Sequence, residues 1–277
     1  MHGSFRATAI SPTRSTSKAK TLRPLHPNLG LAIAYQKKLD RLIAEMQASV
    51  IYHLRAAYKA NPPAMAMDDA LPANALKRVI ETLKKRWLKQ FSDAAPKLAQ
   101  YFATAVNKRT DASLKKILRD GGFSVRFQQT QAMKDVVKAT LEQNVSLIKS
   151  IPEQFLKNVE GDVFRSIQRG RDLGGLTKAL EKNYGVTHRR AAFIARSQNN
   201  LASGAMTAVR FTELGIDTAK WRHSGGGKTK RPSHVANNGK TYKVSTGWYD
   251  PTVKKFIVPG ELPNCRCVAI PVVPGFS

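Results

Sequence analysis

The sequence has 277 residues, of which 42% are hydrophobic and 8% aromatic, and this composition excludes an intrinsically disordered chain. Lysine and arginine total 46 against 19 acidic residues, and the formal net charge of +27 favours a polyanionic partner. No apolar run reaches the roughly 18 residues of a membrane span, so we expect no membrane contact and interpret the polyanion as nucleic acid.

The basic excess is spread over every part of the chain rather than gathered in one element. This distribution predicts salt-sensitive, sequence-independent binding to double-stranded DNA phosphates rather than base reading by one helix. The N-terminus lacks the apolar core of a signal peptide, and two cysteines fit a reducing compartment. We therefore expect the protein in the cytoplasm, or inside a particle assembled there.

Residues 1–28 are predicted to form a basic flexible arm, because they contain three prolines and few large apolar residues. Such an arm has no core of its own and would become ordered against DNA or a protein partner. Its candidate DNA-binding residues are Arg14, Lys18 and Lys20.

Residues 29–150 are predicted to form a region of amphipathic helices. Apolar residues recur at three- and four-residue spacing from Leu29 to about Ala60, from Pro72 onward, and from about Gln129 to Lys149. Pro96 is expected to kink the second helix or start another, and a separate short helix is expected after Thr110. Three consecutive basic residues in this region are candidates for DNA binding or for a solvated helix face: Lys84, Lys85 and Arg86.

Residues 151–215 continue the helical pattern, with expected breaks. Pro152 suits the first turn of a new helix, and Thr187 suits an N-cap after a stop at Gly185. Ser203-Gly204-Ala205 would allow a neighbouring segment to pack closely. The polar residues assigned here are Arg189 and Arg190, expected to contact DNA, and Arg196, expected to form an ion pair from helix to domain.

Beyond Gly215 the periodicity changes to alternation, which predicts short strands at 216–222, 242–244, 256–258 and 268–270. Trp221 is expected to face inward, and the small mixed sheet is expected to pack on the preceding helix. Lys228 and Lys230 lie in the intervening glycine-containing loop and are further DNA-binding candidates. The predicted fold is α+β: a mainly α-helical N-terminal region with long helices, then a small C-terminal α+β domain at 151–277.

The two cysteines, Cys265 and Cys267, stand one residue apart near the C-terminus. In an extended strand their side chains share a face with Cα atoms about 6.5–7 Å apart, a separation that disfavours a disulfide. Two alternatives stay open. The thiols are two ligands of a soft metal such as zinc, completed by His234 or His223, or they are two small core residues. No other cofactor is expected.

The sequence contains no phosphate-binding loop, no nucleophile elbow and no zinc protease motif. Arg231, His234, Tyr242 and Arg266 could gather at one end of the small sheet, as in a metal-free ribonuclease or a nucleotide pocket. The competing interpretation is that these residues tie down a loop by hydrogen bonds, and we expect a protein that is not an enzyme.

The C-terminal region contains, in this order, Trp221, Arg231-Pro232-Ser233-His234, Asn238-Gly239, Pro259-Gly260-Glu261 and Asn264-Cys265-Arg266-Cys267. This order of motifs resembles the phage Mu F-like minor head proteins, the phage head morphogenesis family. The resemblance covers roughly Ile151 to Val273 and includes Ala195 to Asn200. Two departures are Gln198, where the family commonly has Glu, and the absence of an acid shortly before Arg231. The residues assigned to this structural motif are Arg196, Trp221, Arg231, His234, Gly239, Pro259, Gly260, Cys265, Arg266 and Cys267.

The resemblance implies a structural minor head protein of a tailed phage, located inside the head near the portal and assisting head assembly and DNA packaging or ejection. Expected partners are the portal protein, a major capsid or scaffold protein, and DNA. The family is thought to be distantly related in fold to ADP-ribosyltransferases. The alternatives are a nuclease or ADP-ribosyltransferase-like enzyme using Arg231, His234 and Arg266, and a generic DNA-binding module.

Overall fold

The structure is a computed structural model, and it describes residues 11–12, 19–60, 70–170, 172–226 and 230–274. The chain divides into two compact units. Unit 1 comprises Met1–Ala32, Tyr101–Leu141 and Arg196–Ser277, and unit 2 comprises Ile33–Gln100 and Glu142–Ala195. Within the described residues, no helix is both long and apolar enough to cross a membrane.

Four long helices contribute residues to both units: α1 (Leu29–Ala60), α2 (Ala70–Asp120), α3 (Gln131–Gln168) and α4 (Leu173–Glu213). Asn28 begins α1 by accepting a hydrogen bond from the backbone of Leu31 at 3.0 Å. The Thr130 hydroxyl similarly accepts from Met133 at the start of α3, and Asp172 accepts from Gly175 at the start of α4. Gly122 follows the end of α2 with a φ of 92°.

The expected helix breaks are wrong at several places. Helix α2 continues through Pro96, so no new helix starts there, and it also continues through Thr110; α3 continues through Pro152. Helix α4 continues through Gly185, so Thr187 is not an N-cap; its hydroxyl donates instead to the carbonyl of Asn183 within the helix, at 2.8 Å. Each proline removes one hydrogen bond, and helices that pack along their length can absorb that local loss.

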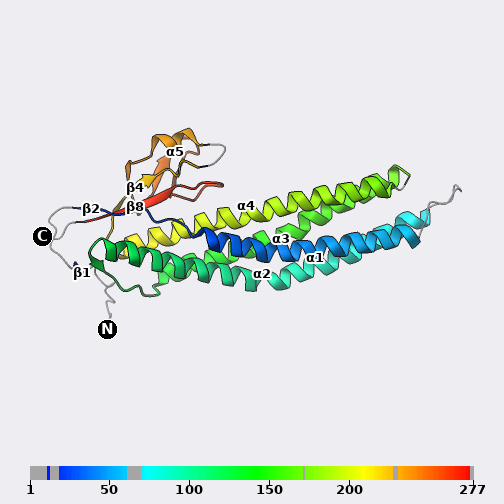
Figure 1. The fold of residues 1–277 in the computed structure, drawn as a ribbon, viewed down its shortest axis with the longest axis horizontal. Coiled ribbons are helices and arrows are strands. Elements are labelled where there is room, and N and C mark those ends of the chain that lie inside the picture. Colours follow the sequence, from blue (N-terminus) through cyan, green and yellow to red (C-terminus); the bar gives the residue numbers. More distant parts are fainter. Residues whose placement is uncertain (1–10, 13–18, 61–69, 171, 227–229, 275–277) are drawn as a thin grey trace. The chain divides into compact units, whose positions relative to one another are not determined.

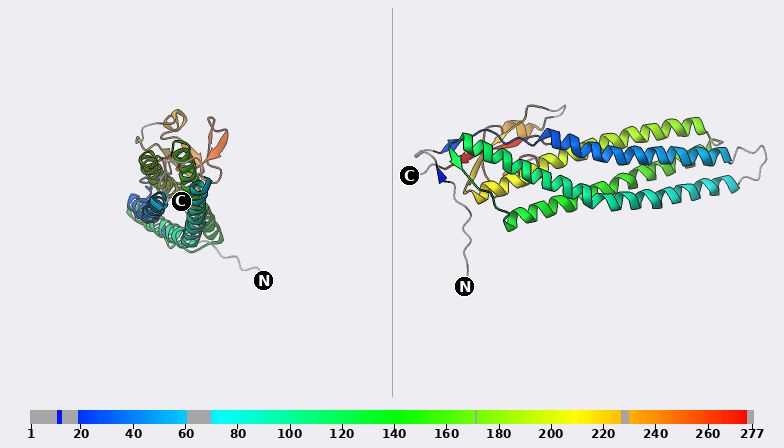
Figure 2. Two further views of the ribbon diagram at one scale, coloured as in Figure 1. Left: turned by 90° about the vertical axis from the view of Figure 1, so that its right-hand side faces the viewer. Right: turned by 60° about the horizontal axis from the view of Figure 1, so that its bottom comes forward.

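Segments of the four helices run side by side in unit 2, as Figure 1 and Figure 2 both show. Their core is apolar, with Tyr35, Leu39 and Phe91 all fully buried. A few polar side chains cross this core in pairs: the Tyr35 hydroxyl donates to Asn144 at 3.0 Å, and the Gln47 amide donates to the carbonyl of Leu180 at 3.2 Å. The amphipathic pattern of the sequence is therefore used for helix packing.

Unit 1 contains the small sheets, and the described strand pairs are all antiparallel, so the expectation of a mixed sheet is wrong. The four-stranded sheet has the order β2-β8-β4-β5, and two-stranded sheets are formed by β6-β7 and β1-β3. A short connection joins β6 to β7, as suits antiparallel pairing, whereas β2, β4 and β8 come from parts of the chain that are far apart in the sequence. The strands are β1 (Ser11–Pro12), β2 (Lys20–Thr21), β3 (Phe123–Ser124), β4 (Thr218–Arg222), β5 (Thr241–Lys243), β6 (Trp248–Asp250), β7 (Lys255–Ile257) and β8 (Val268–Val273).

Two parts of the basic arm are described: β1, which pairs with β3, and residues 19–28, which pair with β8 of the same chain (Figure 1). Strand β2 matches Lys20 to Val273, and the backbones of Leu22 and Leu25 go on to donate to Pro271 and Ala269, each at 3.1 Å. Leu25 is buried in the core that lies beneath the sheet. This segment of the arm is thus an edge strand of unit 1.

The sheet packs on the end of α4, as expected, and also on α2. The shared core includes Phe211 and Leu214 from α4, and Leu114 and Leu118 from α2. Trp221 is fully buried in this core, which confirms its inward orientation. The fold is α+β, as the sequence predicts, and this core supports the loops that carry the candidate site.

Candidate functional site

His234 lies on the short helix α5 (Pro232–Ala236), between β4 and β5. Pro232 occupies the first turn, where its missing N–H causes no loss, and the Arg231 backbone before it is extended. His234 is only 2% exposed, because its ring packs edge-on against Trp221 at a centroid distance of 5.1 Å. Trp248 contacts the same ring at 5.9 Å. The imidazole is therefore enclosed by aromatic side chains.

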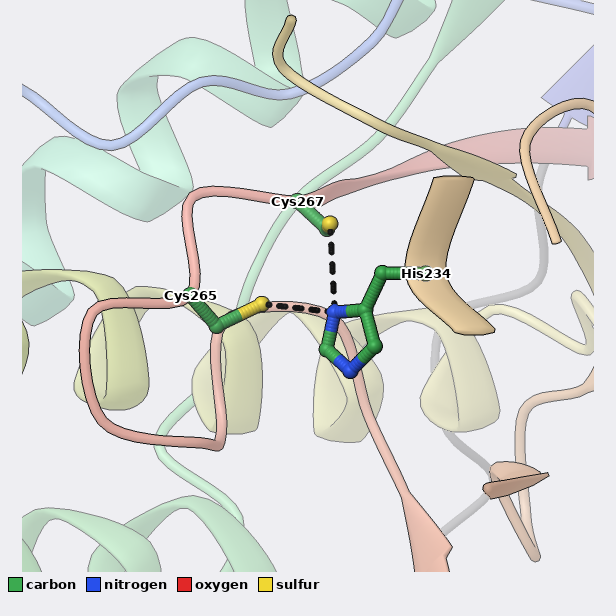
Figure 3. Close-up of side chains that lie close together, drawn as sticks. All are labelled: His234, Cys265 and Cys267. Carbon is green, nitrogen blue, oxygen red and sulfur yellow. Dashed lines mark hydrogen bonds between the residues drawn. The ribbon is translucent and has the colours of Figure 1, made fainter. Parts of the chain in front are cut away.

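Cys265 and Cys267 lie in the loop just before β8, and both are buried and free of a disulfide. A tight turn holds this loop, with Asn264 at a φ of 59° and the Cys265 N–H bonded to the carbonyl of Leu262 at 2.8 Å. Both sulfurs approach Nδ1 of His234, at 3.5 Å from Cys265 and 3.6 Å from Cys267 (Figure 3). Of the two histidines considered as partners for the cysteines, it is His234 that lies between them.

Asp250 completes the arrangement from β6, and it was not predicted as a site residue from the sequence. Its Oδ2 lies 3.2 Å from Nε2 of His234, and its carboxylate is fully buried. Burial opposes the charged form, yet the pKa of Asp250 is lowered because the Thr252 backbone N–H donates to Oδ1 at 2.9 Å and because His234 is near. The carboxylate is thus held charged against the imidazole.

The two thiols are not equivalent. A hydrogen bond from Cys267 lowers the pKa of Cys265 to about 4, and backbone N–H groups of Gly260 and Cys267 favour the same thiolate. Donating that hydrogen bond raises the pKa of Cys267, and burial acts in the same direction. The pocket therefore stabilises negative charge on sulfur.

The loop that carries the cysteines docks closely on α4. A Cβ at Gly204 would lie 2.3 Å from the carbonyl oxygen of Pro259, and one at Gly260 would lie 2.7 Å from that of Asn200. The Asn200 side chain also donates to the carbonyl of Cys265 at 2.8 Å. The expected close packing at Gly204 is confirmed, and the Pro259-Gly260 turn sets the position of Cys265.

The proposed catalytic constellation does not form an accessible site. Arg231 donates to the carbonyl of Pro263 at 2.8 Å, which ties its loop down, and Tyr242 is buried against Trp221 at a ring distance of 6.1 Å. Arg266 is exposed. His234 is buried with both ring nitrogens engaged, so it offers no acid or base to a substrate.

Two further residues of the structural motif, Gly239 and Arg196, lie in a turn and on α4 respectively. Gly239 has a φ of 82°, a conformation that favours glycine, and its N–H donates to the carbonyl of Trp221 at 2.7 Å. Arg196 is half-buried on α4 and forms no ion pair with the residues that the structure describes, so the expected helix-to-domain ion pair is not seen there.

The candidate DNA-binding residues fall into three groups. Some are engaged within the protein: Lys20 donates to the carbonyl of Gly121, Lys84 pairs with Glu160, and Arg190 bonds to Ser150 and Gln154. Others are exposed, namely Lys85, Arg86, Arg189 and Lys230. Arg14, Lys18 and Lys228 lie outside the described residues.

A row of exposed basic residues on α2 was not assigned from the sequence. Lys108, Lys115 and Arg119 are seven and four residues apart and so share one helix face, with Arg109 and Lys116 beside them. The two acids of this stretch are used elsewhere, since Asp111 pairs with Arg210 and Asp120 with Arg23. Combining helical periodicity with charge would have revealed this row.

Arg210 forms a buried ionic cluster that the sequence analysis also missed. Its guanidinium is 1% exposed, donates twice to Asp111 at 2.7 and 2.8 Å, and donates to Glu213 at 2.7 Å. It also donates to the carbonyl of Gln128 and lies 4.7 Å from the ring centre of Phe127. This cluster joins α4 to α2 and to the segment before α3.

Comparisons with known proteins give two matches. Residues 157–270 match the family model described as "Phage Mu protein F like protein". An uncharacterized protein of Haemophilus influenzae (strain ATCC 51907 / DSM 11121 / KW20 / Rd) is 27% identical over 268 residues. The aligned region is 93% of this chain and 56% of that protein, so the chain spans little more than half of its relative. No solved structure matches the chain.

Proposed function

Because residues 157–270 are a Mu F-like segment, as the resemblance at Ile151 to Val273 predicts, we propose that this protein acts in head morphogenesis of a tailed phage. The observation that carries the proposal is the family match over the region where α4, the small sheet and the cysteine loop pack together. More specifically, we propose a minor head protein that lies inside the capsid near the portal. Its partners would be the portal protein and a major capsid or scaffold protein.

The geometry favours a structural role over an enzymatic one. The cavity beside the candidate site, lined by Asn200, Gly204, Pro259 and Cys267, has a volume of about 20 Å³. That space suits a single water molecule and is far too small for a nucleotide. With His234 enclosed by tryptophans, these residues serve better to shape the domain than to turn over a substrate.

Contact with packaged DNA is supported by the exposed row on α2 together with the net charge of +27. Like charges on one helix face repel each other, so such a row reduces helix stability unless a polyanion neutralises it. Exposed lysines and arginines bind phosphates without reading bases. The protein would therefore hold DNA of any sequence, as a component in contact with a packaged genome must.

DNA affinity measured against salt concentration tests this contact. We expect the logarithm of the binding constant to fall linearly with the logarithm of salt concentration, with no preference among duplex sequences. The double variant Lys115→Gln/Lys116→Gln should reduce the slope by roughly 2. The matched control is Lys84→Gln/Lys89→Gln, which removes two lysines paired with Glu160 and Asp93 and should change the slope less.

The structural assignment itself is tested in particles. Quantitative mass spectrometry of purified virions from a phage that encodes this chain should find it in every preparation, and it should resist proteases that do not enter the head. Absence from mature virions, or complete digestion from outside, would overturn the proposed location. An unchanged salt slope in Lys115→Gln/Lys116→Gln would overturn the assignment of DNA contact to α2.

A further inference from the structure

Beyond head assembly, we propose that His234, Cys265 and Cys267 bind one zinc ion that locks the small C-terminal sheet in place. Their three candidate ligand atoms, Nδ1 and two sulfurs, lie within 4.8 Å of one another, and all three residues are buried. Figure 3 shows the side chains turned toward a common centre from α5 and from the loop before β8. Nitrogen and thiolate sulfur are ligands that zinc prefers, whereas magnesium and calcium take oxygen.

The two distances from Nδ1 to the sulfurs match tetrahedral zinc. Bond lengths of about 2.3 Å for Zn–S and 2.0–2.1 Å for Zn–N place neighbouring ligand atoms of a tetrahedron about 3.5–3.8 Å apart. The observed Nδ1–Sγ distances are 3.5 Å to Cys265 and 3.6 Å to Cys267. An ion can therefore be accommodated with little movement of the three side chains.

Asp250 fixes the histidine in the orientation that a metal requires. Its carboxylate accepts from Nε2 of His234, which puts the ring proton on that nitrogen and leaves the Nδ1 lone pair directed at the sulfurs. A carboxylate behind a metal-bound imidazole is a recurrent arrangement in zinc sites. Asp250 is a positioning residue here, since it touches the histidine and not the ion.

The surroundings of the sulfurs also favour metal-bound thiolates. Backbone N–H groups of Gly260 and Ser224 are directed at Cys265 and Cys267 respectively, and such donors stabilise negative charge on metal-bound sulfur. Two thiolates and a neutral imidazole balance the charge of Zn²⁺, so no net charge is buried at the ligands. Among the described residues, no fourth His, Cys, Asp or Glu joins the group, which leaves the fourth position to water.

The ion would connect segments that are distant in sequence. His234 belongs to α5, the cysteines belong to the loop that docks on α4 through Gly204 and Asn200, and Asp250 belongs to β6. Because all three ligands are buried, the ion has a structural task. It supplies cohesion that the short strands of this region, mostly three residues long, provide only weakly.

Metal analysis of the full chain tests the proposal. Protein purified without chelator should contain one equivalent of zinc, and Co²⁺ bound in its place should give the intense visible bands of a tetrahedral sulfur-ligated site. Cys265→Ser and Cys267→Ser should each lower zinc affinity by at least 100-fold. His223→Ala is the matched control, because this nearby histidine instead accepts from the Gly225 backbone, and it should retain full zinc.

Asp250→Asn provides a second test if the cysteine variants fail to fold. This variant should still bind zinc, but with roughly 10- to 100-fold lower affinity, measured by competition with a chromogenic chelator. The proposal is overturned if wild-type protein contains no zinc, shows no rise in melting temperature on adding equimolar Zn²⁺, and presents two titratable thiols whether or not zinc is added. Equal zinc content in wild-type protein and Cys265→Ser would overturn it as well.

Discussion

The two units of this chain reach stability by different means. Unit 2 buries apolar faces of four helices, and some of its buried polar groups pair across helices, as Tyr35 does with Asn144. Unit 1 buries charged and titratable groups: Arg210 with two carboxylates, and His234 between Asp250 and two thiols. Burial of apolar surface tolerates many substitutions, whereas a buried charge requires its particular partners. The two units should therefore fail in different ways.

Loss of the buried charge in unit 1 should give the largest effect. Arg210→Met leaves Asp111 and Glu213 without their cation, and removing one partner of a buried ion pair costs about 3–5 kcal/mol of unfolding free energy. Urea denaturation measures this loss. Hydrogen exchange should locate it in residues 101–141 and 196–222, which belong to unit 1.

The matched control is Arg119→Met, which removes an exposed arginine from α2 and should change the unfolding free energy by less than about 0.5 kcal/mol. Equal losses for the two variants would show that the cluster around Arg210 adds no more than a surface charge.

A cavity in unit 2 should cost somewhat less. Leu39 is fully buried on α1, so Leu39→Ala removes apolar contacts and should lower the unfolding free energy by about 3–4 kcal/mol. Faster hydrogen exchange is expected first in residues 33–100, whereas Leu39→Met should retain most of the stability because volume is conserved. If hydrogen exchange in Leu39→Ala became equally fast in both units, the two units would not differ in how they lose stability.

The turn that carries Cys265 gives a smaller, more local effect. Gly260→Ala combines a φ of 90° with a Cβ only 2.7 Å from the Asn200 carbonyl oxygen, and it should cost about 2–3 kcal/mol. Gly239→Ala has a similar φ of 82° but open space, and it should cost about 1 kcal/mol. Thermal unfolding compares the two, and equal melting temperatures would refute the close contact with α4.

Alkaline pH should act on both units alike, through one tyrosine in each. Burial raises the pKa of Tyr35 in unit 2 and of Tyr242 in unit 1 above the ordinary value of 10.0. Above pH 10 the unfolded chain releases these protons while the folded protein keeps them, so stability is full below pH 10 and falls as pH rises.

Tyr35→Phe or Tyr242→Phe should each reduce the loss of unfolding free energy between pH 9 and pH 11 by about 1.4 kcal/mol, the value for one proton over one pH unit. Urea denaturation at the two pH values measures it, with the exposed Tyr52→Phe as the matched control. If the unfolding free energy of Tyr35→Phe depends on pH as strongly as that of the wild type, the Tyr35 phenol of the wild type ionises without opening the core.

Periodicity in the sequence predicted the helices well but not their continuity. Pro96 and Pro152 look like boundaries because each lacks a donor, yet both lie inside helices that pack along their length. A proline in the sequence indicates the loss of one backbone hydrogen bond. Whether the helix continues depends also on packing against residues that are far away in the sequence. For the same reason β2 was missed: a strand at Lys20–Thr21 exists only because β8 offers it an edge.

The candidate site was predicted in part. The cysteines and His234 were identified by residue type, and the structure brings them together. Asp250 could not be assigned because it lies 16 residues from His234 and no local pattern marks it. The scarcity of acidic residues in the C-terminal region could have pointed to Asp250, because a rare carboxylate in a basic protein commonly pairs with another side chain.

The pairing of β2 with β8 has a consequence for biosynthesis. Lys20 and Thr21 lie far from Val272 and Val273 in the sequence, so a ribosome makes the two paired segments at widely separated times. The four-stranded sheet therefore cannot close until β8 has been synthesised. Until then the edge of β4 that pairs with β8 is open to pairing with other chains.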